Sequence, residues 1–153
     1  MTELKLVPRS ASQDLAEQWV EALRQQGYRS TAARRAVAQV LAASESALRP
    51  QEIHEQARRL HPRIGLVTVY RCLEAMEKLH LLQSIHLPDG SHGYLAEFSG
   101  HQHLLACLDC GRVLYFEGDD MSRLAAELEE QSGYSIQSHT LQFQGRCEDC
   151  HTE

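Results

Sequence analysis

The sequence contains no long hydrophobic run. Its apolar runs, such as residues 104–107, are far shorter than the roughly 20 residues that a helix needs to cross a bilayer. The N-terminus also lacks the basic segment followed by an apolar segment that marks a secretory signal peptide. We therefore expect a protein without a membrane segment that works in the cytoplasm.

Low-complexity tracts are absent too, and the only internal repetition is a pair of Cys-x-x-Cys units. The 153 residues are 42% apolar and 24% charged, which is the composition of an ordinary folded protein. A chain of this length can bury one substantial core or two small ones. The composition therefore argues against intrinsic disorder.

Acidic and basic residues are unevenly distributed along the chain. The net charge of −6 does not by itself suggest a nucleic-acid-binding protein. Residues 1–85, however, carry 12 basic and 9 acidic residues, a net charge of +3, whereas residues 86–153 carry 3 and 12, a net charge of −9. A solvated helix face could explain any one arginine, but the segregation favours a DNA-facing N-terminal half. Seven arginines fall among its predicted helices: Arg29, Arg34, Arg35, Arg58, Arg59, Arg63 and Arg71.

Four helices are predicted in the N-terminal half from apolar residues at helical spacing and from helix-end signals. Ser12 caps the first, which stops at Gly27, and Thr31 caps the second. Pro50 suits the first position of the third helix. The fourth spans about residues 67–79.

A β-hairpin is predicted directly after these helices. Residues 82–86 alternate in polarity, residues 88–91 (PDGS) form a turn, and a second extended segment surrounds Tyr94. Helices closed by a hairpin suggest a winged helix, in which the helix before the wing enters the major groove of DNA. The residues at the start of that helix that can reach bases and phosphates are Thr68, Tyr70 and Arg71.

The C-terminal half changes character. Short β-rich runs at 101–107, 112–117 and 136–145 surround one predicted helix at about 120–131. We therefore expect an α+β protein with an N-terminal winged-helix domain and a C-terminal α/β domain. The expected boundaries are 1–85 for the first domain, with the wing extending to about 98, and 99–153 for the second.

Four of the five cysteines form two Cys-x-x-Cys pairs, Cys107 with Cys110 and Cys147 with Cys150. The cytosol keeps thiols reduced, so a disulfide framework is not expected there. Two such turns supply the tetrahedral sulfur shell that structural Zn²⁺ prefers, and zinc would tie two distant parts of the chain together. A redox dithiol and unrelated surface thiols are the competing interpretations. Cys72 has no partner at ligand spacing and is expected to be a small residue of the fourth helix.

Three histidines form a second candidate metal site. His101 and His103 lie two residues apart in a predicted strand, so they project from the same face, and His139 is the distant third. If 101–107 and 112–117 form a hairpin closed by the turn at 107–111, Glu117 falls opposite His101 and Tyr115 opposite His103. Glu117 is therefore the preferred carboxylate ligand, and three imidazoles with one carboxylate suit tetrahedral Zn²⁺.

Each of these ligands has an ordinary alternative role. His139 could be a core histidine, because it shares a predicted strand face with Leu141 and Phe143. Asp119 and Asp120 are fallback carboxylates, although their place before a helix is explained by N-capping.

Three motifs follow one another in a specific order: RSTAAR at 29–34, IGLVTVYR at 64–71 and HQHLLACLDCG at 101–111. The first two are similar to the R-x-T-P-Q-R and S-L-A-T-V-Y-R motifs of the ferric uptake regulator superfamily, which the chain resembles over nearly its entire length. The resemblance implies an N-terminal winged-helix domain, a C-terminal dimerisation domain and metal-dependent binding of a palindromic operator by the dimer.

The resemblance also implies roles for individual residues. The four paired cysteines match the family's structural zinc site, and His101, His103 and His139 match three ligands of a metal site near the hinge between domains. The fourth ligand position aligns with Ser122, a poor metal ligand, which leaves the carboxylate to Glu117. The family's other sensory site is not matched, because its histidine positions hold Gln102 and Leu104 and its upstream position holds Leu95 or Ala96. The DNA-binding candidates are Arg29, Thr31, Arg34, Thr68, Tyr70 and Arg71.

Histidine-dominated tetrahedral ligation favours zinc over iron, which usually collects more oxygen ligands. We therefore expect a zinc-sensing regulator of zinc homeostasis, most like the zinc-uptake branch, with one structural and one regulatory Zn²⁺ per subunit. Its expected partners are an operator in double-stranded DNA and a second copy of the chain, with no membrane and no small-molecule substrate. An iron- or peroxide-responsive regulator is the alternative. A small zinc hydrolase, or a zinc chaperone or buffer, is the more distant one, and we expect no enzymatic activity.

Overall fold

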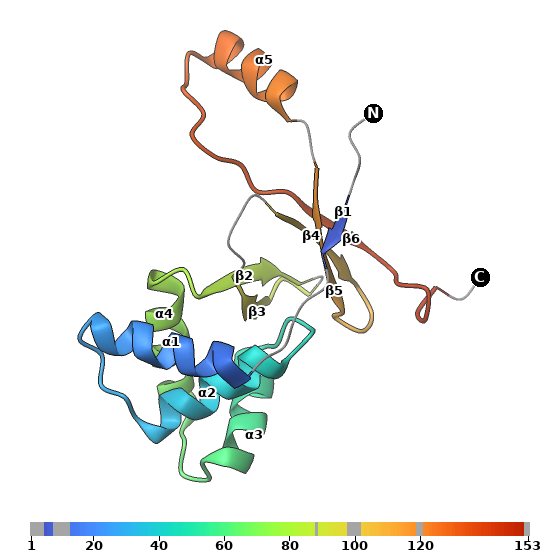
Figure 1. The fold of residues 1–153 in the computed structure, drawn as a ribbon. Helices are drawn as coiled ribbons and strands as arrows, with labels where there is room; N and C mark the ends of the chain where they lie inside the picture. The colour runs from blue at the N-terminus through green and yellow to red at the C-terminus, as the bar shows by residue number, and fades with distance from the viewer. Residues whose placement is uncertain (1–4, 8–12, 88, 98–101, 119–120, 152–153) are drawn as a thin grey trace.

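The computed structural model describes residues 5–7, 13–87, 89–97, 102–118 and 121–151. A group of helices forms one half of the molecule and a β-sheet with one projecting helix forms the other (Figure 1). None of the helices in the described part of the chain combines the length and apolarity needed to cross a membrane.

The four predicted helices of the N-terminal half are confirmed as α1 Gln13–Gln25, α2 Ala32–Ala43, α3 Pro50–Leu60 and α4 Leu66–Lys78. Their end signals act as expected. The Thr31 side chain accepts a hydrogen bond from the backbone N–H of Arg34 at 3.2 Å, and Pro50 is the first residue of α3. Gly27 has a φ of +85°, a left-handed conformation that ends α1. The predicted cap Ser12 lies outside the described residues.

The helices bury one apolar stripe each in a common core. Cys72 belongs to this core, at 2% exposure, and burial raises the pKa of its thiol. This burial confirms its expected role as a small core residue. The largest fully buried side chains of this core are Leu23, Leu41, Ile53, Leu73, Met76, Leu82, Val37 and Val69.

The wing is a two-stranded antiparallel hairpin of β2 Leu82–His86 and β3 His92–Ala96. Its register pairs Leu82 with Ala96 at the α4 end and His86 with His92 at the turn. The predicted hairpin is therefore confirmed, and with α1 to α4 it makes a winged helix. Pro88 of the predicted turn lies outside the described residues.

The second sheet has four strands in the order β1-β5-β4-β6. They are β1 Lys5–Val7, β4 His103–Cys107, β5 Val113–Glu117 and β6 Gln142–Gly145. Strands β1 and β4 flank β5 antiparallel, and β6 runs parallel to β4. Helix α5, Ser122–Ser132, projects away from the sheet and has no buried residue (Figure 1). The expected α+β fold is thus confirmed.

The predicted register of the β4–β5 hairpin is wrong by one residue. The structure pairs His103 with Phe116 and Leu104 with Tyr115, so Tyr115 is not opposite His103. The turn is one residue longer than expected, because Gly111 adopts a φ of +73° inside it and Cys107 N–H bonds to the Arg112 carbonyl at 2.8 Å.

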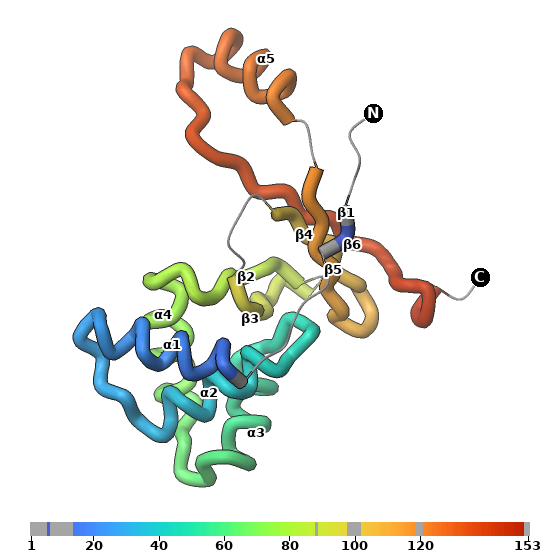
Figure 2. The backbone as a smooth tube through the Cα atoms, in the orientation of Figure 1, coloured from blue at the N-terminus to red at the C-terminus, as the bar shows by residue number. Residues whose placement is uncertain are grey.

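The predicted strand at 136–145 is also wrong in its first part. Only Gln142–Gly145 forms a strand with β4, and residues 133–141 return from α5 outside any strand (Figure 2). At the end of this segment, the Leu141 carbonyl accepts one hydrogen bond from the Leu104 N–H at 3.3 Å. His139 lies in this return segment and is exposed, so it is not a core histidine of the single chain. Strand β1 was not predicted from the sequence, and it adds residues of the N-terminal segment to the C-terminal sheet.

A second apolar core joins the wing to the sheet. Wing residues Ile85 and Leu95 pack with Leu104 and Tyr115 of the sheet, and the Tyr115 hydroxyl donates to the Ala96 carbonyl at 3.4 Å. The remaining members of this core are Ala47, Ala106, Val113 and the partly buried Leu87. The helical half and the sheet are therefore joined by direct packing and not only by the connecting chain.

Candidate metal centres

The four paired cysteines converge at one end of the sheet. Strands β4 and β6 are parallel and pair Cys107 with Gly145, so the two Cys-x-x-Cys turns that follow them lie side by side. The sulfur atoms of Cys107, Cys110, Cys147 and Cys150 all lie within 4.8 Å of one another, and those of Cys110 and Cys147 are 3.7 Å apart. Four convergent sulfurs fit tetrahedral structural zinc.

Backbone N–H groups prepare this site for thiolate sulfur. The backbone N–H groups of Cys110, Cys147 and Asp109 lower the pKa of Cys107 to about 6, and the Cys147 N–H donates to the Cys107 sulfur at 3.4 Å. By contrast, hydrogen bonds with the thiols of Cys147 and Cys110 raise the pKa of Cys150 to about 12. Four adjacent sulfurs cannot all ionise without a cation, and Zn²⁺ would supply it.

Two ion pairs connect the cysteine turns. The Arg112 guanidinium lies 2.6 Å from the carboxylate of Asp149, and Arg146 lies 3.1 Å from Asp109. Each turn thus contributes one arginine just outside its cysteine pair and one aspartate inside it. Pattern analysis did not anticipate these pairs, because no spacing rule links charges so distant in sequence.

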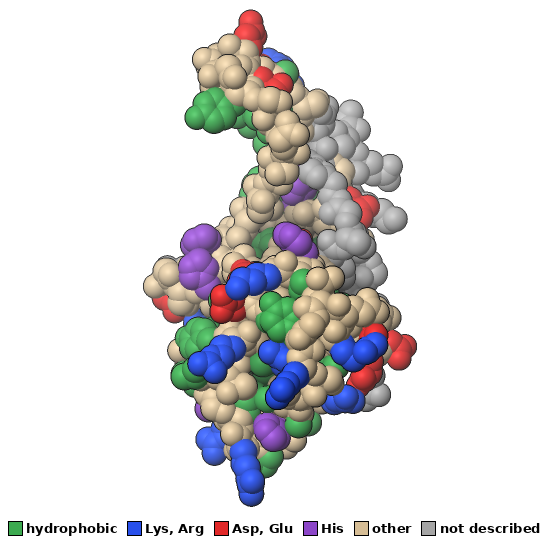
Figure 3. Space-filling model, turned by 90° about the vertical axis from the view of Figure 1, so that its left-hand side faces the viewer, with side chains coloured by type: hydrophobic (Ala, Val, Ile, Leu, Met, Phe, Trp, Pro, Cys, Tyr) green, Lys and Arg blue, Asp and Glu red, His purple; other side chains and the backbone are tan. Residues whose placement is uncertain are grey.

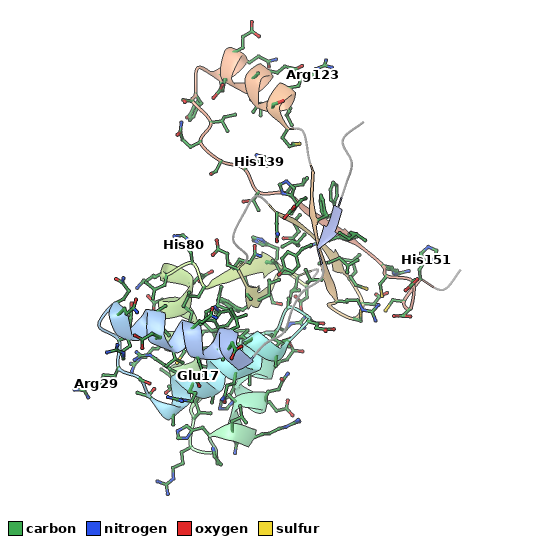
Figure 4. The ribbon with its side chains drawn as sticks, viewed as in Figure 1. Glu17, Arg29, His80, Arg123, His139 and His151 are labelled. Atoms are coloured by element: carbon green, nitrogen blue, oxygen red, sulfur yellow. The ribbon has the colours of Figure 1, made fainter. Side chains whose placement is uncertain are left out.

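His103 and His139 come together at the opposite end of the same two strands. His103 is 3% exposed, and its ring stacks on that of His139 with centroids 5.2 Å apart and an interplanar angle of 24°. The ring of Phe116 also contacts His103, with centroids 5.4 Å apart. Figure 4 shows His139 on the return segment, above the wing and far from His151 at the C-terminal turn. The third expected ligand, His101, lies outside the described residues.

A cavity of about 150 Å³ adjoins these histidines, between the wing and the sheet. Its lining includes His103, His139, Gln102 and the carboxylate residue Glu97, which follows β3. Glu97 also pairs with His80, whose Nδ1 lies 3.7 Å away. Sequence reasoning missed Glu97, although it is the only acidic residue between Asp89 and Asp109.

The observed register removes the reason for choosing Glu117 as a metal ligand. Glu117 now falls opposite Gln102, and its carboxylate accepts a hydrogen bond from the Gln102 side-chain amide at 2.8 Å. In an antiparallel pair, neighbouring positions alternate between faces, so Glu117 and His103 point to opposite faces. Among the described residues, only the four cysteines bring three or more His, Cys or carboxylate ligand atoms within 4.8 Å. The fallback ligands Asp119 and Asp120 lie outside the described residues.

The candidate DNA-binding residues lie on the helical half. Tyr70 is 44% exposed near the start of α4, Arg71 is exposed beside it, and Thr68 is half-buried. Arg34 lies over the Tyr28 ring, 5.2 Å from its centroid, and donates a hydrogen bond to the Arg29 carbonyl. On the face shown in Figure 3, basic side chains gather over this half of the molecule.

Known proteins resemble the chain in sequence and fold. Residues 25–144 match the model of the ferric uptake regulator family. The zinc uptake regulation protein of Mycobacterium tuberculosis is 34% identical over 124 residues, which cover 81% of this chain and 95% of that protein.

Two solved structures share the fold. The Helicobacter pylori ferric uptake regulator covers 96% of this chain and 99% of its own, with a TM-score of 0.71 and 21% identity. A zinc uptake regulator complexed with zinc and DNA covers 92% and 95%, with a TM-score of 0.69 and 18% identity. The chain belongs to the ferric uptake regulator family of metal-responsive transcription regulators.

Proposed function

We propose that this protein is a zinc-sensing regulator that binds a palindromic operator as a homodimer. The observation that carries the proposal is the stacked pair of His103 and His139 beside the cavity between wing and sheet. Imidazole-rich ligation suits zinc better than iron. The likeness to a zinc uptake regulation protein supports the same metal.

The two metal sites have different tasks in this proposal. The cysteine site is assembled from two turns within the sheet, and its zinc is structural. The histidine site adjoins a cavity that wing residues also line, so zinc bound there can influence the DNA-binding half. We assign the sensing of zinc to this site. His101 is its predicted third ligand, and Glu97 and Glu117 are the two carboxylate candidates for the fourth position. Glu97 is the first candidate, because it lines the same cavity as both described histidines. The His103 ring shares the outer face of β4 with Leu105, so a shared ion requires Glu97 to reach past the first residue of that strand.

A second copy of the chain would cover the outer face of the sheet. Alternation along the strands places Leu6, Leu105, Leu114 and Phe143 on the face turned away from the wing, where they are 66, 39, 44 and 52% exposed. Helix α5 adds Leu124 and Leu128, each about half exposed, and Tyr134 follows at 77%. Large apolar side chains exposed together on one sheet face mark a protein interface. A dimer formed there would carry two winged helices, which suits two operator half-sites.

Zinc acts in this proposal by shifting a population of domain arrangements. An ion held by His103 of the sheet, by His139 of the return segment and by Glu97 after the wing favours the arrangement in which both α4 helices match successive major-groove half-sites. Zinc binding and DNA binding must then strengthen each other by the same factor.

Titration of DNA binding with different metals tests this function. The probe is a duplex selected from a randomised pool by the zinc-loaded protein, and zinc, iron or manganese is added in turn after chelation of exchangeable metal. We expect zinc to give the largest gain in DNA affinity, and His139→Ala to abolish that gain while the cysteine-bound zinc remains. A larger gain with iron would favour the iron-responsive alternative, and binding that ignores all three metals would overturn the proposal.

A further inference from the structure

Two glutamine side chains of β6 form hydrogen bonds to one backbone oxygen of the wing. The side-chain amide nitrogens of Gln142 and Gln144 donate hydrogen bonds to the carbonyl oxygen of His86, at 3.2 and 3.0 Å. His86 is the last residue of β2, where the wing reaches its turn. A carbonyl oxygen has two lone pairs, so it can accept both bonds together.

The strand register explains why both glutamines reach the wing. Gln142 pairs with Leu104 and Gln144 with Ala106, and these two β4 residues pack in the core that joins the sheet to the wing. Phe143, between the glutamines, points to the opposite face of the sheet. The glutamines therefore add two hydrogen bonds between sheet and wing at the edge of their apolar contact. Apolar contacts tolerate sliding because they lack direction, whereas two converging hydrogen bonds fix one position of the wing on β6.

The same contact lies between the sensory histidines and the recognition helix. Strand β6 begins three residues after His139, and the wing strand β2 begins four residues after α4 ends at Lys78. A displacement of the return segment on metal binding would be carried along β6 to the amides of Gln142 and Gln144. From the His86 carbonyl it would pass through the hairpin to α4.

We propose that Gln142 and Gln144 form a latch that couples the sensory metal site to the DNA-binding half. The proposal rests on the proposed function, because it assumes that metal at His103 and His139 governs DNA affinity. The glutamines are neither proposed metal ligands nor candidate DNA-binding residues, so their role here is that of positioning residues. Removal of the two side chains is expected to leave the sensory metal site and the DNA-binding surface intact and to weaken only the coupling between these two sites.

The test compares the double variant Gln142→Ala/Gln144→Ala with the wild type. The measured quantity is the ratio of DNA affinities with and without the sensory metal, on the selected duplex. Two hydrogen bonds of ordinary net strength correspond to roughly a ten-fold loss in this ratio. Zinc content and dimerisation are expected to be unchanged. By reciprocity, the gain in zinc affinity caused by DNA falls by the same factor, which a purely structural role would not produce.

Two further variants sharpen the result. Gln142→Glu/Gln144→Glu keeps the size of both side chains but directs carboxylate oxygens at the His86 carbonyl, so its loss of coupling should be at least as large. Gln25→Ala is the matched control, because the Gln25 amide donates a similar bond to Glu21 on the surface of α1. A wild-type ratio in both double variants would overturn the latch alone. A wild-type protein whose DNA affinity ignores zinc, iron and manganese would overturn the proposed function and the latch with it.

Discussion

Asp109 and Arg146 form an ion pair of 3.1 Å that joins the two cysteine turns, although 37 residues separate them in the chain. The reciprocal pair of Arg112 with Asp149 closes the same gap from the other side. Both pairs are partly exposed to solvent, so their contribution to stability is small. Their effect should therefore appear in the rate at which the cysteine turns release zinc.

Reversal of one charge at a time should accelerate zinc loss from the cysteine site. For Asp109→Arg or Arg146→Asp we expect roughly a two- to five-fold faster transfer of zinc to a chromophoric chelator, in keeping with the modest strength of exposed pairs. The double exchange Asp109→Arg/Arg146→Asp restores the attraction and should return the rate to that of the wild type. The surface pair Glu74–Lys78 provides the control, since Glu74→Lys should leave the rate unchanged. Failure of the double exchange to recover would remove the role assigned to the pair.

Cysteine substitutions should separate the metal site from the helical core. Cys110→Ser is expected to release the structural zinc and to loosen the sheet, because the site holds the end of the chain to β4. Cys72→Ser buries a hydroxyl in an apolar core and should cost roughly 1–3 kcal/mol of unfolding free energy while the zinc stays bound. Metal analysis and thermal unfolding measure the two effects. A Cys110→Ser protein with full zinc content and unchanged stability would contradict the structural role.

The sequence was most informative where local chemistry decides the structure. Thr31, Pro50 and Gly27 set helix ends through their own backbone and side-chain preferences, so the helices were predictable to within a few residues. The convergence of the four cysteines was predictable as well, because the Cys-x-x-Cys spacing within each turn does not depend on the register of the neighbouring strands.

Features that depend on tertiary context were not predictable. One residue in the left-handed conformation at Gly111 shifted the register and moved Glu117 to the face opposite His103. Glu97 carries no motif, and only the packing of the wing against the sheet brings it to the cavity. Strand β1 is three residues long, too short for a periodic signal.

The two candidate carboxylates of the sensory site can be distinguished by isosteric substitution. We expect Glu97→Gln to weaken sensory zinc binding roughly 10- to 100-fold, as loss of a ligand or of its close support does. Glu117→Gln should have a smaller effect, because Glu117 is engaged with Gln102. Zinc titration against a competing chelator, with the cysteine site already filled, measures both affinities. The reverse order of effects would return the ligand role to Glu117.

Arg71 should contribute to DNA affinity because it lies in the first half of α4, the helix expected to enter the major groove. Its side chain is exposed, and an arginine there can reach a base edge or a phosphate. Arg71→Ala is expected to weaken DNA binding roughly 5- to 150-fold and to lower its salt dependence if the contact is to phosphate. Arg123→Ala on α5 removes another exposed arginine, from the other half of the molecule, and should change neither quantity. Equal losses in the two variants would show that α4 has no special part in binding.

A charge on the outer face of the sheet should dissociate the dimer without unfolding the chain. Leu114 is 44% exposed in the single chain, so Leu114→Asp places its carboxylate in water while the protein is monomeric. In the proposed dimer the same carboxylate would be buried against apolar side chains, which should weaken association roughly 100-fold. Leu60→Asp, at a 56% exposed position on α3, is the control and should leave association unchanged. Sedimentation analysis measures the dissociation constant, and circular dichroism verifies folding. A fully dimeric Leu114→Asp protein would place the interface elsewhere, and the operator symmetry expected from two winged helices would then need another geometric basis.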